Sequence, residues 1–207
     1  MIALPTYVEP VDDRTMTFQQ LFALGMKRRL PELLTCQGKS FDVGASGKYV
    51  APGAIPLGPP LWVWPRDKIP CSDNEAATVH CYHFLEHLTG DDAISFLREV
   101  ERVLIPDRGV FNFSVPYFSS VLAAQNLEHK SQWCEETFRN LFEDDTYEHS
   151  GKWRLKVRFL LIAGIVGRNM CLIGQIIKTE EEQGKSGEWF HPNDVTRRRA
   201  VLQPTNE

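Results

Sequence analysis

The sequence predicts an α/β fold with an open, mostly parallel sheet and an antiparallel hairpin at its C-terminal edge. Between residues 39 and 142, short apolar runs alternate with segments of helical periodicity, which is typical of parallel strands joined by crossover helices. Two longer apolar runs, residues 153–166 and 170–178, then follow each other across Gly167-Arg168-Asn169, as in a hairpin. A length of 207 residues suits one domain with a single core.

The first part of the chain predicts an arm, a helix, a strand and a long loop. Residues 1–14 contain two prolines and mixed charge, which is typical of an arm. Residues 15–34 have apolar side chains at near-helical spacing, interrupted by Pro31, and predict a leading helix that covers one edge of the sheet. Residues 39–43 predict the first strand. The proline-rich 51–70 segment predicts mostly loop, because proline lacks the N–H that helices and sheets need.

The remaining elements follow from apolar periodicity. The chain predicts in order a strand at 76–83, a helix at 91–104, a strand at 110–115 and a helix at 135–142. We therefore expect a single domain over residues 1–180. After Thr179 the chain becomes polar, and residues 181–207 predict a weakly ordered tail.

The composition is typical of a globular protein and gives no indication of binding to nucleic acid or to a membrane. The net charge is −4, so no overall basic field draws the chain to nucleic acid. No apolar run approaches the roughly 18 residues of a membrane span, and the N-terminus lacks the residue order of a signal peptide. The five cysteines are scattered without a CxxC pair, which favours reduced thiols. We expect a cytoplasmic protein whose partners include neither a membrane nor nucleic acid.

Ligands of open α/β sheets bind at the carboxyl ends of the strands, where the strand order changes direction. The segments expected at this edge are 44–47, 58–71, 83–87 and 115–120. Glycines in the first segment let the backbone approach a ligand, although an ordinary strand-to-helix turn has the same residues. In the second segment, Trp62 and Trp64 either stack on a ligand ring or cover the sheet, and we favour the second interpretation.

A longer series of motifs runs through the middle of the chain. The sequence contains IPCSDN at 69–74, HFLEHL at 83–88, FLREVERVLIP at 96–106 and VP at 115–116. It continues with EHK at 128–130, Trp133, ETF at 136–138 and LF at 141–142. In order and spacing this series resembles the type 11 group of small S-adenosylmethionine-dependent methyltransferases. The resemblance covers about residues 40–142.

The resemblance implies a Rossmann-like class I methyltransferase fold, with a seven-stranded sheet whose last strand is inserted antiparallel. It also implies S-adenosylmethionine as the cofactor, lying over the turn after the first strand, with His83 facing its methionine end. The residues expected to bind the cofactor are Asp42, Gly44, Ala45, Ser46, Gly47, Asp67 and His83.

Several positions depart from the family pattern on the cofactor side. Ser46 replaces a glycine, and Gly58 stands where the family places an acid that binds the ribose hydroxyls. Pro65 corresponds to the adenine-side acid, for which Asp67 is the nearest substitute. Losing one charge-assisted hydrogen bond costs about 1.5–3 kcal/mol, which is about ten- to a hundredfold in affinity. The alternative function is therefore a binding or scaffold protein that keeps the fold without the cofactor.

Methyl transfer requires an acceptor aligned with the methyl group and a base that removes a proton. His129 and Lys130 are candidate bases, because they follow the strand that ends at Pro116. His83 is the second catalytic candidate, although a lone histidine is more often structural. We expect the acceptor to be an oxygen or nitrogen of a small-molecule or glycan-like compound. Methylation of adenine in DNA is disfavoured, since no Asp/Asn-Pro-Pro-Tyr/Phe motif follows the 76–83 strand.

A rival motif overlaps this stretch. The pentapeptide His83-Phe84-Leu85-Glu86-His87 fits HxxEH, the inverted zinc-peptidase signature. That mechanism needs both histidines on one face of a helix, whereas the sequence predicts the end of a strand here. We therefore expect no metal site and keep a zinc peptidase as a remote third candidate.

Overall fold

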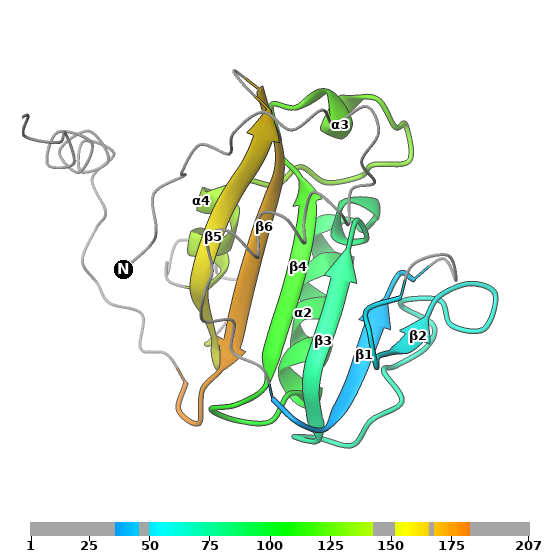
Figure 1. Cartoon of the computed structure of the whole chain (residues 1–207), viewed down its shortest axis with the longest axis vertical. Coiled ribbons are helices and arrows are strands. Elements are labelled where there is room, and N and C mark those ends of the chain that lie inside the picture. The colour runs from blue at the N-terminus through cyan, green and yellow to red at the C-terminus, as the bar shows by residue number, and fades with distance from the viewer. Residues whose placement is uncertain (1–35, 46–49, 143–151, 166–167, 183–207) are drawn as a thin grey trace, which may run out of the picture.

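A six-stranded sheet forms the centre of the protein (Figure 1). The computed structural model describes residues 36–45, 50–142, 152–165 and 168–182. The strands are β1 (Lys39–Val43), β2 (Ile55–Leu57), β3 (Ala76–Tyr82), β4 (Val110–Pro116), β5 (Leu155–Ile165) and β6 (Arg168–Lys178). Their order across the sheet is β2-β1-β3-β4-β6-β5.

The pairing confirms the predicted α/β class. Strands β2, β1, β3 and β4 pair in parallel, and β6 lies antiparallel between β4 and β5. The described sheet has six strands, where the resemblance implied seven. Residues 58–75, between β2 and β3, form turns and bends instead of a strand, because the prolines of this segment cannot donate to a strand ladder.

Some expectations shift by a few residues or lie outside the described part of the chain. Arg168 and Asn169, expected in the hairpin turn, belong to β6. The arm, the leading helix, Ser46, Gly47, residues 166–167 and residues 183–207 are outside the described residues.

Helix α2 (Gly90–Val103) covers one side of the sheet and starts and ends one residue before the predicted 91–104 helix. The Thr89 hydroxyl accepts the Asp92 N–H and caps the helix. Asp91 and Asp92 in the first turn also favour this end, because carboxylates interact well with the helix dipole.

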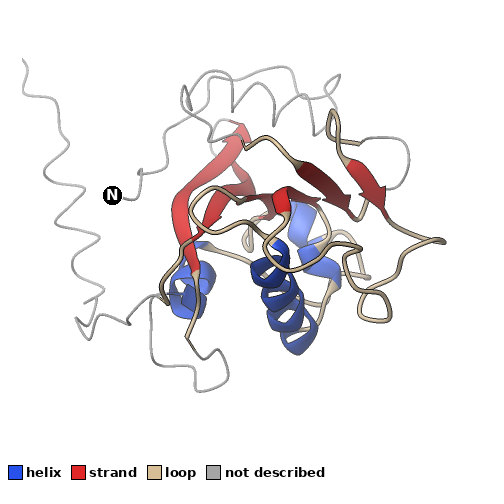
Figure 2. Cartoon of the chain, turned by 90° about the horizontal axis from the view of Figure 1, so that it is seen from below, coloured by secondary structure: helices blue, strands red, loops and turns tan. Residues whose placement is uncertain are grey.

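The other described helices are shorter. Helix α4 (Glu135–Phe142) has the predicted bounds and lies on the same side of the sheet as α2 (Figure 2). The 3₁₀ helix η1 (Leu85–His87) and α3 (Val121–Ala124) are too short to produce a periodic sequence pattern, and the sequence does not predict them. No helix of the described residues is long and apolar enough to cross a membrane.

Aromatic rings fill the space between the sheet and these helices. Phe111 and Phe113 of β4 stack with ring centroids 5.5 Å apart, and Phe138 of α4 stacks on Phe113 at 4.4 Å. Gly174 of β6 makes room for this stack, since a Cβ atom there would lie 2.4 Å from Phe113 Cζ. The β6 residue opposite Phe113 must therefore be very small.

The two tryptophans of the proline-rich segment are part of the same core. Trp62 and Trp64 are buried, and Trp64 packs edge-on against Phe96 of α2 at 5.5 Å. The indole N–H of Trp62 donates to the Lys68 carbonyl, and that of Trp64 to the Asp92 carbonyl. Both side chains therefore belong to the hydrophobic core, between their own loop and α2.

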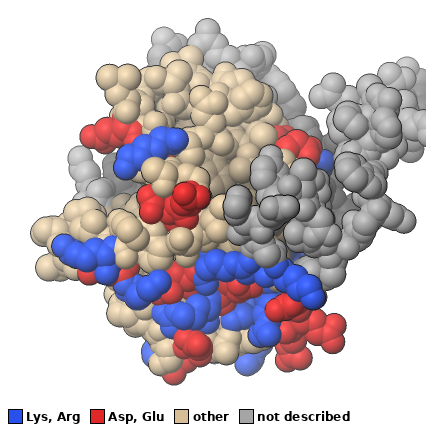
Figure 3. All heavy atoms as spheres, turned by 180° about the vertical axis from the view of Figure 1, so that it is seen from behind, with Lys and Arg blue, Asp and Glu red and all other residues tan. Residues whose placement is uncertain are grey.

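Cationic and acidic side chains gather next to one another in the lower part of the view in Figure 3, which looks at the molecule from behind. Arg102 pairs with Glu99 and with Asp73, at 2.7 Å in each case. It also donates to the carbonyls of Ile69 and Cys71, which fixes the segment before β3 to the helix. Glu99 is buried and accepts the Ile69 N–H, so the Arg102 charge compensates a carboxylate within the fold.

Candidate functional site

The carboxyl ends of β1 and β3 lie side by side and bring two predicted segments together. After Val43 the chain turns at Gly44, whose φ is +82°, a conformation that favours glycine. The Gly44 N–H donates to the Leu57 carbonyl at 2.8 Å. A Cβ atom on Gly44 would lie 2.9 Å from the Cβ of Phe84. The first part of the expected cofactor turn therefore packs directly against the residue that follows His83.

Asp42 lies just before this turn and is buried, with 3% of its surface exposed. Its Oδ2 accepts the Ala51 N–H at 2.7 Å, which closes the loop between β1 and β2. Burial raises the pKa of the Asp42 carboxyl to about 6, and the hydrogen bond from Ala51 offsets part of this shift. In the parallel register Asp42 pairs with His80 of β3. Burial lowers the pKa of His80 to about 4.

The end of β2 explains why no acid stands at position 58. A Cβ atom on Gly58 would lie 2.4 Å from the Ala45 carbonyl oxygen, so no side chain fits there without moving the β1 turn. Asp67, the proposed substitute, accepts the Val63 N–H at 2.8 Å and pairs with Arg66. These contacts lower the pKa of Asp67 and hold its carboxylate within its own turn. Its role in cofactor binding stays a prediction.

His83 occupies a tight turn between β3 and η1. Its φ is +54°, and its N–H donates to the Ser114 carbonyl of β4 at 2.9 Å. The His83 Nδ1–H donates to Glu86 Oε1 at 2.9 Å. Because η1 has only three residues, the HxxEH pentapeptide does not form the helix that an inverted zinc peptidase requires.

The loop after α3 returns to η1 and is fastened to it. The backbone N–H groups of Lys130 and Ser131 both donate to the Glu86 carbonyl, at 2.7 and 3.2 Å. The Ser131 hydroxyl donates to the Leu85 carbonyl. These three bonds hold the neighbouring His129 against the turn that follows β3. Lys130 itself is exposed.

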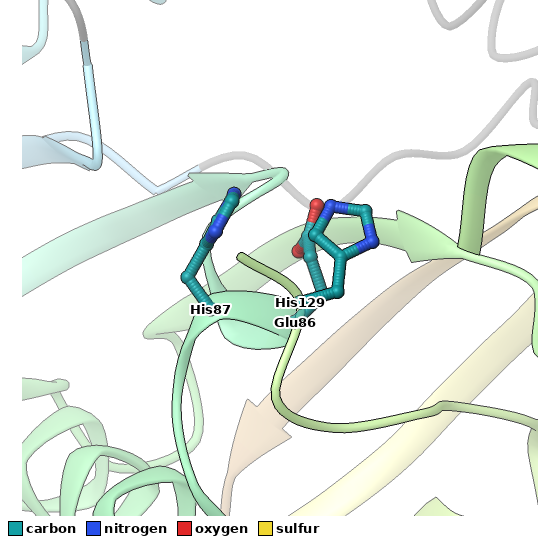
Figure 4. A group of neighbouring side chains, drawn as sticks. All are labelled: Glu86, His87 and His129. Carbon is teal, nitrogen blue, oxygen red and sulfur yellow. The ribbon is translucent and has the colours of Figure 1, made fainter. Parts of the chain in front are cut away.

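His129 therefore meets two residues that the sequence places far from it. Its Nδ1–H donates to the Ala123 carbonyl at 3.0 Å, and its ring lies 5.0 Å from that of His87 in an edge-on arrangement. Ligand atoms of Glu86, His87 and His129 all lie within 4.8 Å of one another (Figure 4). The sequence indicates His129 as a candidate base and predicts the end of a strand at residues 83–87. It does not predict that they meet, because the contact depends on how the 117–131 loop folds back.

Two solved structures have a similar fold. A chain from a Haloferax volcanii complex that contains the Trm112 methyltransferase activator matches with a TM-score of 0.52 and 12% identity, over 79% of this chain and 91% of that one. A SAM-dependent methyltransferase from Archaeoglobus fulgidus matches with a TM-score of 0.51 and 12% identity, over 80% of this chain and 97% of that one. No family model and no curated protein sequence matches. The chain thus has the class I methyltransferase fold that the sequence motifs implied.

Proposed function

We propose that this protein is an S-adenosylmethionine-dependent methyltransferase that acts on an oxygen or nitrogen of a small-molecule or glycan-like acceptor. The observation that carries the proposal is the contact between Gly44 and Phe84. It joins the turn after β1 to the turn that carries His83, at the edge where sheets of this kind bind ligands. A protein of similar fold is described as a SAM-dependent methyltransferase, which agrees with this assignment.

Two described residues support cofactor binding at the first turn. Gly44 supplies a positive φ, which lets the chain turn sharply, and the buried carboxylate of Asp42 holds the loop closed behind it. Together with Ala45, Ser46 and Gly47 they are the residues that we propose hold the cofactor. Bound S-adenosylmethionine supplies a sulfonium methyl group, whose transfer leaves the bonding electron pair on sulfur while the acceptor loses a proton to a base.

Two histidines are proposed for the acceptor side. Glu86 fixes the orientation of the His83 ring through Nδ1. His129 donates its Nδ1–H to a backbone carbonyl, so in the neutral ring the lone pair is on Nε2. That nitrogen can remove a proton from an acceptor or bind a cation.

A second candidate function is favoured by the end of β2. The Ala45 carbonyl excludes any side chain from position 58, so the ribose hydroxyls would lack the acid that the family places there. A protein that keeps the fold as a binding or scaffold module would have the same feature.

Calorimetric titration with S-adenosylmethionine and S-adenosylhomocysteine distinguishes the two. We expect micromolar binding by the wild type and a loss of at least about tenfold in affinity for Gly44→Ala, whose Cβ would displace Phe84. Gly53→Ala is the matched control, because Gly53 also has a positive φ, +76°, but has no atoms within 4 Å of the added Cβ. Absence of binding at millimolar ligand would favour the scaffold function. Equal losses in both glycine variants would remove the first turn from the cofactor site.

A further inference from the structure

We infer that Glu86, His87 and His129 form a binding site for one divalent transition-metal ion, which the methyltransferase proposal neither requires nor implies. The sequence led us to expect no metal here. The structure brings together one carboxylate and two imidazoles, from η1 and from the loop after α3 (Figure 4). Their candidate ligand atoms lie within 4.8 Å of one another. Two atoms each about 2.1 Å from one ion lie at most about 4.2 Å apart, so small side-chain rotations suffice to enclose an ion.

The buried carboxylate of Glu86 is the strongest observation. Glu86 is 1% exposed, and its Oε1 accepts the His83 Nδ1–H. Its Oε2 is buried and has no hydrogen-bond partner among the described residues. A buried carboxylate oxygen without a partner destabilises a fold, and such groups are rare. A bound cation would satisfy this oxygen.

His129 has the orientation of a metal ligand. Metal-binding histidines generally donate their second ring N–H to a carbonyl or carboxylate, which fixes the tautomer and aims the other nitrogen. His129 does this through Nδ1, with the Ala123 carbonyl as acceptor. Glu86 receives a comparable supporting bond from His83. The structure thus contains a supporting hydrogen bond for each of these two side chains.

The backbone also holds the ligands in place. Glu86 and His87 are consecutive residues of η1, and the Glu86 carbonyl accepts the N–H groups of Lys130 and Ser131. The segment that carries His129 therefore cannot move away from η1 without breaking these bonds. A preorganised ligand set binds a cation more tightly than one that must be ordered during binding.

The ligand types indicate which ion the site would take. Imidazole favours zinc, iron, cobalt and nickel over magnesium and calcium, which prefer oxygen ligands. Two histidines and one glutamate with open positions is also the ligand set of some catalytic zinc sites. If the proposed function holds, an open position would suit a hydroxyl oxygen of the acceptor, whose proton a divalent cation makes easier to remove. His129 would then act as a ligand instead of a base.

Metal binding can be measured without any substrate. The full chain is purified without a tag, stripped with a chelator, and titrated with Zn²⁺ and, in parallel, with Mg²⁺. We expect one Zn²⁺ per chain and much weaker binding of Mg²⁺. Co²⁺ should produce the visible absorption bands of an ion bound by nitrogen ligands. His129→Gln and His87→Gln should each weaken Zn²⁺ binding by more than about tenfold, the minimum seen when only supporting contacts are lost.

His80→Gln is the control, because His80 lies on β3 and is not part of the three-residue set. It should retain full Zn²⁺ binding. Glu86→Gln is a further ligand variant, and its thermal unfolding in the metal-free state reports whether it folds. The inference is overturned if the wild type binds no Zn²⁺ at millimolar concentration, or if both His87→Gln and His129→Gln bind it as the wild type does. S-adenosylmethionine titration of the metal-free protein separates the two proposals: cofactor binding without Zn²⁺ binding rejects the metal site alone, and the reverse rejects the methyltransferase function alone.

Discussion

Replacement of Asp42 by asparagine should change how the stability of the protein depends on pH. The Asp42 carboxyl is buried at the end of β1, and burial raises its pKa from 3.8 to about 6. Asparagine has nearly the same shape, and its side-chain oxygen can still accept the Ala51 N–H that Asp42 now binds. The substitution therefore removes the ionisation of this group while keeping the loop contact.

The sign of the pH effect on stability follows from whether the folded or the unfolded state holds the Asp42 proton. Between about pH 4 and pH 6 the folded state keeps a proton on Asp42 that the unfolded chain has released, so this carboxyl lowers stability as the pH rises. Above pH 6 both states are ionised and the loss levels off. A shift from 3.8 to about 6 at 1.36 kcal/mol per pH unit gives a total of about 3 kcal/mol. Between about pH 4.5 and about pH 7.5 the expected change is about 2 kcal/mol.

Urea unfolding followed by tryptophan fluorescence measures this, because Trp62, Trp64, Trp133 and Trp153 are buried. The free energy of unfolding of Asp42→Asn minus that of the wild type should increase by about 2 kcal/mol from pH 4.5 to pH 7.5. Asp67→Asn is the control: its contacts lower the pKa of Asp67, so that difference should stay nearly constant over this range. A constant difference for Asp42→Asn would refute the argument that burial governs this carboxyl.

Three further substitutions test other parts of the fold by the same unfolding measurement. Because burial lowers the pKa of His80 from 6.5 to about 4, the free energy of unfolding of His80→Gln minus that of the wild type should increase by about 2.5 kcal/mol as the pH falls from 7.5 to 4.5, a pH dependence opposite in sign to that of Asp42→Asn. Gly174→Ala should destabilise by about 2 kcal/mol, since its Cβ would overlap the Phe113 ring, and Phe113→Leu in the same chain should restore part of the loss. Arg102→Met should lower the free energy of unfolding by about 2–3 kcal/mol, because it removes the cation that pairs with the buried Glu99 carboxylate. Adding Glu99→Gln should restore part of this stability. An equal loss in the double variant would contradict the pairing.

The parts of the fold with strong periodicity could be predicted from the sequence. The α2 and α4 helices and the strands β3 and β4 agree with the prediction within one residue. Each has a continuous apolar pattern over at least seven residues, so local sequence and tertiary packing specify the same structure. The described sheet lacks the seventh strand that the resemblance implied. The prolines of residues 51–70 correctly predicted mostly loop there, whereas the resemblance predicted only the family's usual sheet.

The candidate site also has parts that the sequence could predict and parts that it could not. The Gly44 turn and the His83 turn each have a local motif, and the structure places them in contact through Phe84. No local sequence motif predicts that His129 lies next to Glu86. Their proximity depends on the hydrogen bonds that the Lys130 and Ser131 N–H groups donate to the Glu86 carbonyl. Contacts between turns far apart in sequence depend on tertiary structure, which motif spacing alone does not contain.

The two sides of the proposed site differ in whether their polar groups destabilise the folded state. This difference bears on the scaffold alternative. On the proposed cofactor side, two described positions carry no unsatisfied polar group: Gly58 has no side chain, and the Asp67 carboxylate accepts the Val63 N–H of its own turn. On the proposed acceptor side, Glu86 has a buried carboxylate oxygen that finds no hydrogen-bond partner in the described part of the chain. A module that only preserved the fold would be more stable with an apolar side chain there, because an unsatisfied buried carboxylate destabilises the folded state by several kcal/mol.

The Glu86 carboxylate lies beside two imidazoles, and a backbone carbonyl already orients one of them, that of His129. A positively charged ligand would satisfy this carboxylate, which supports a binding function at η1 even if cofactor binding at the β1 turn is weak.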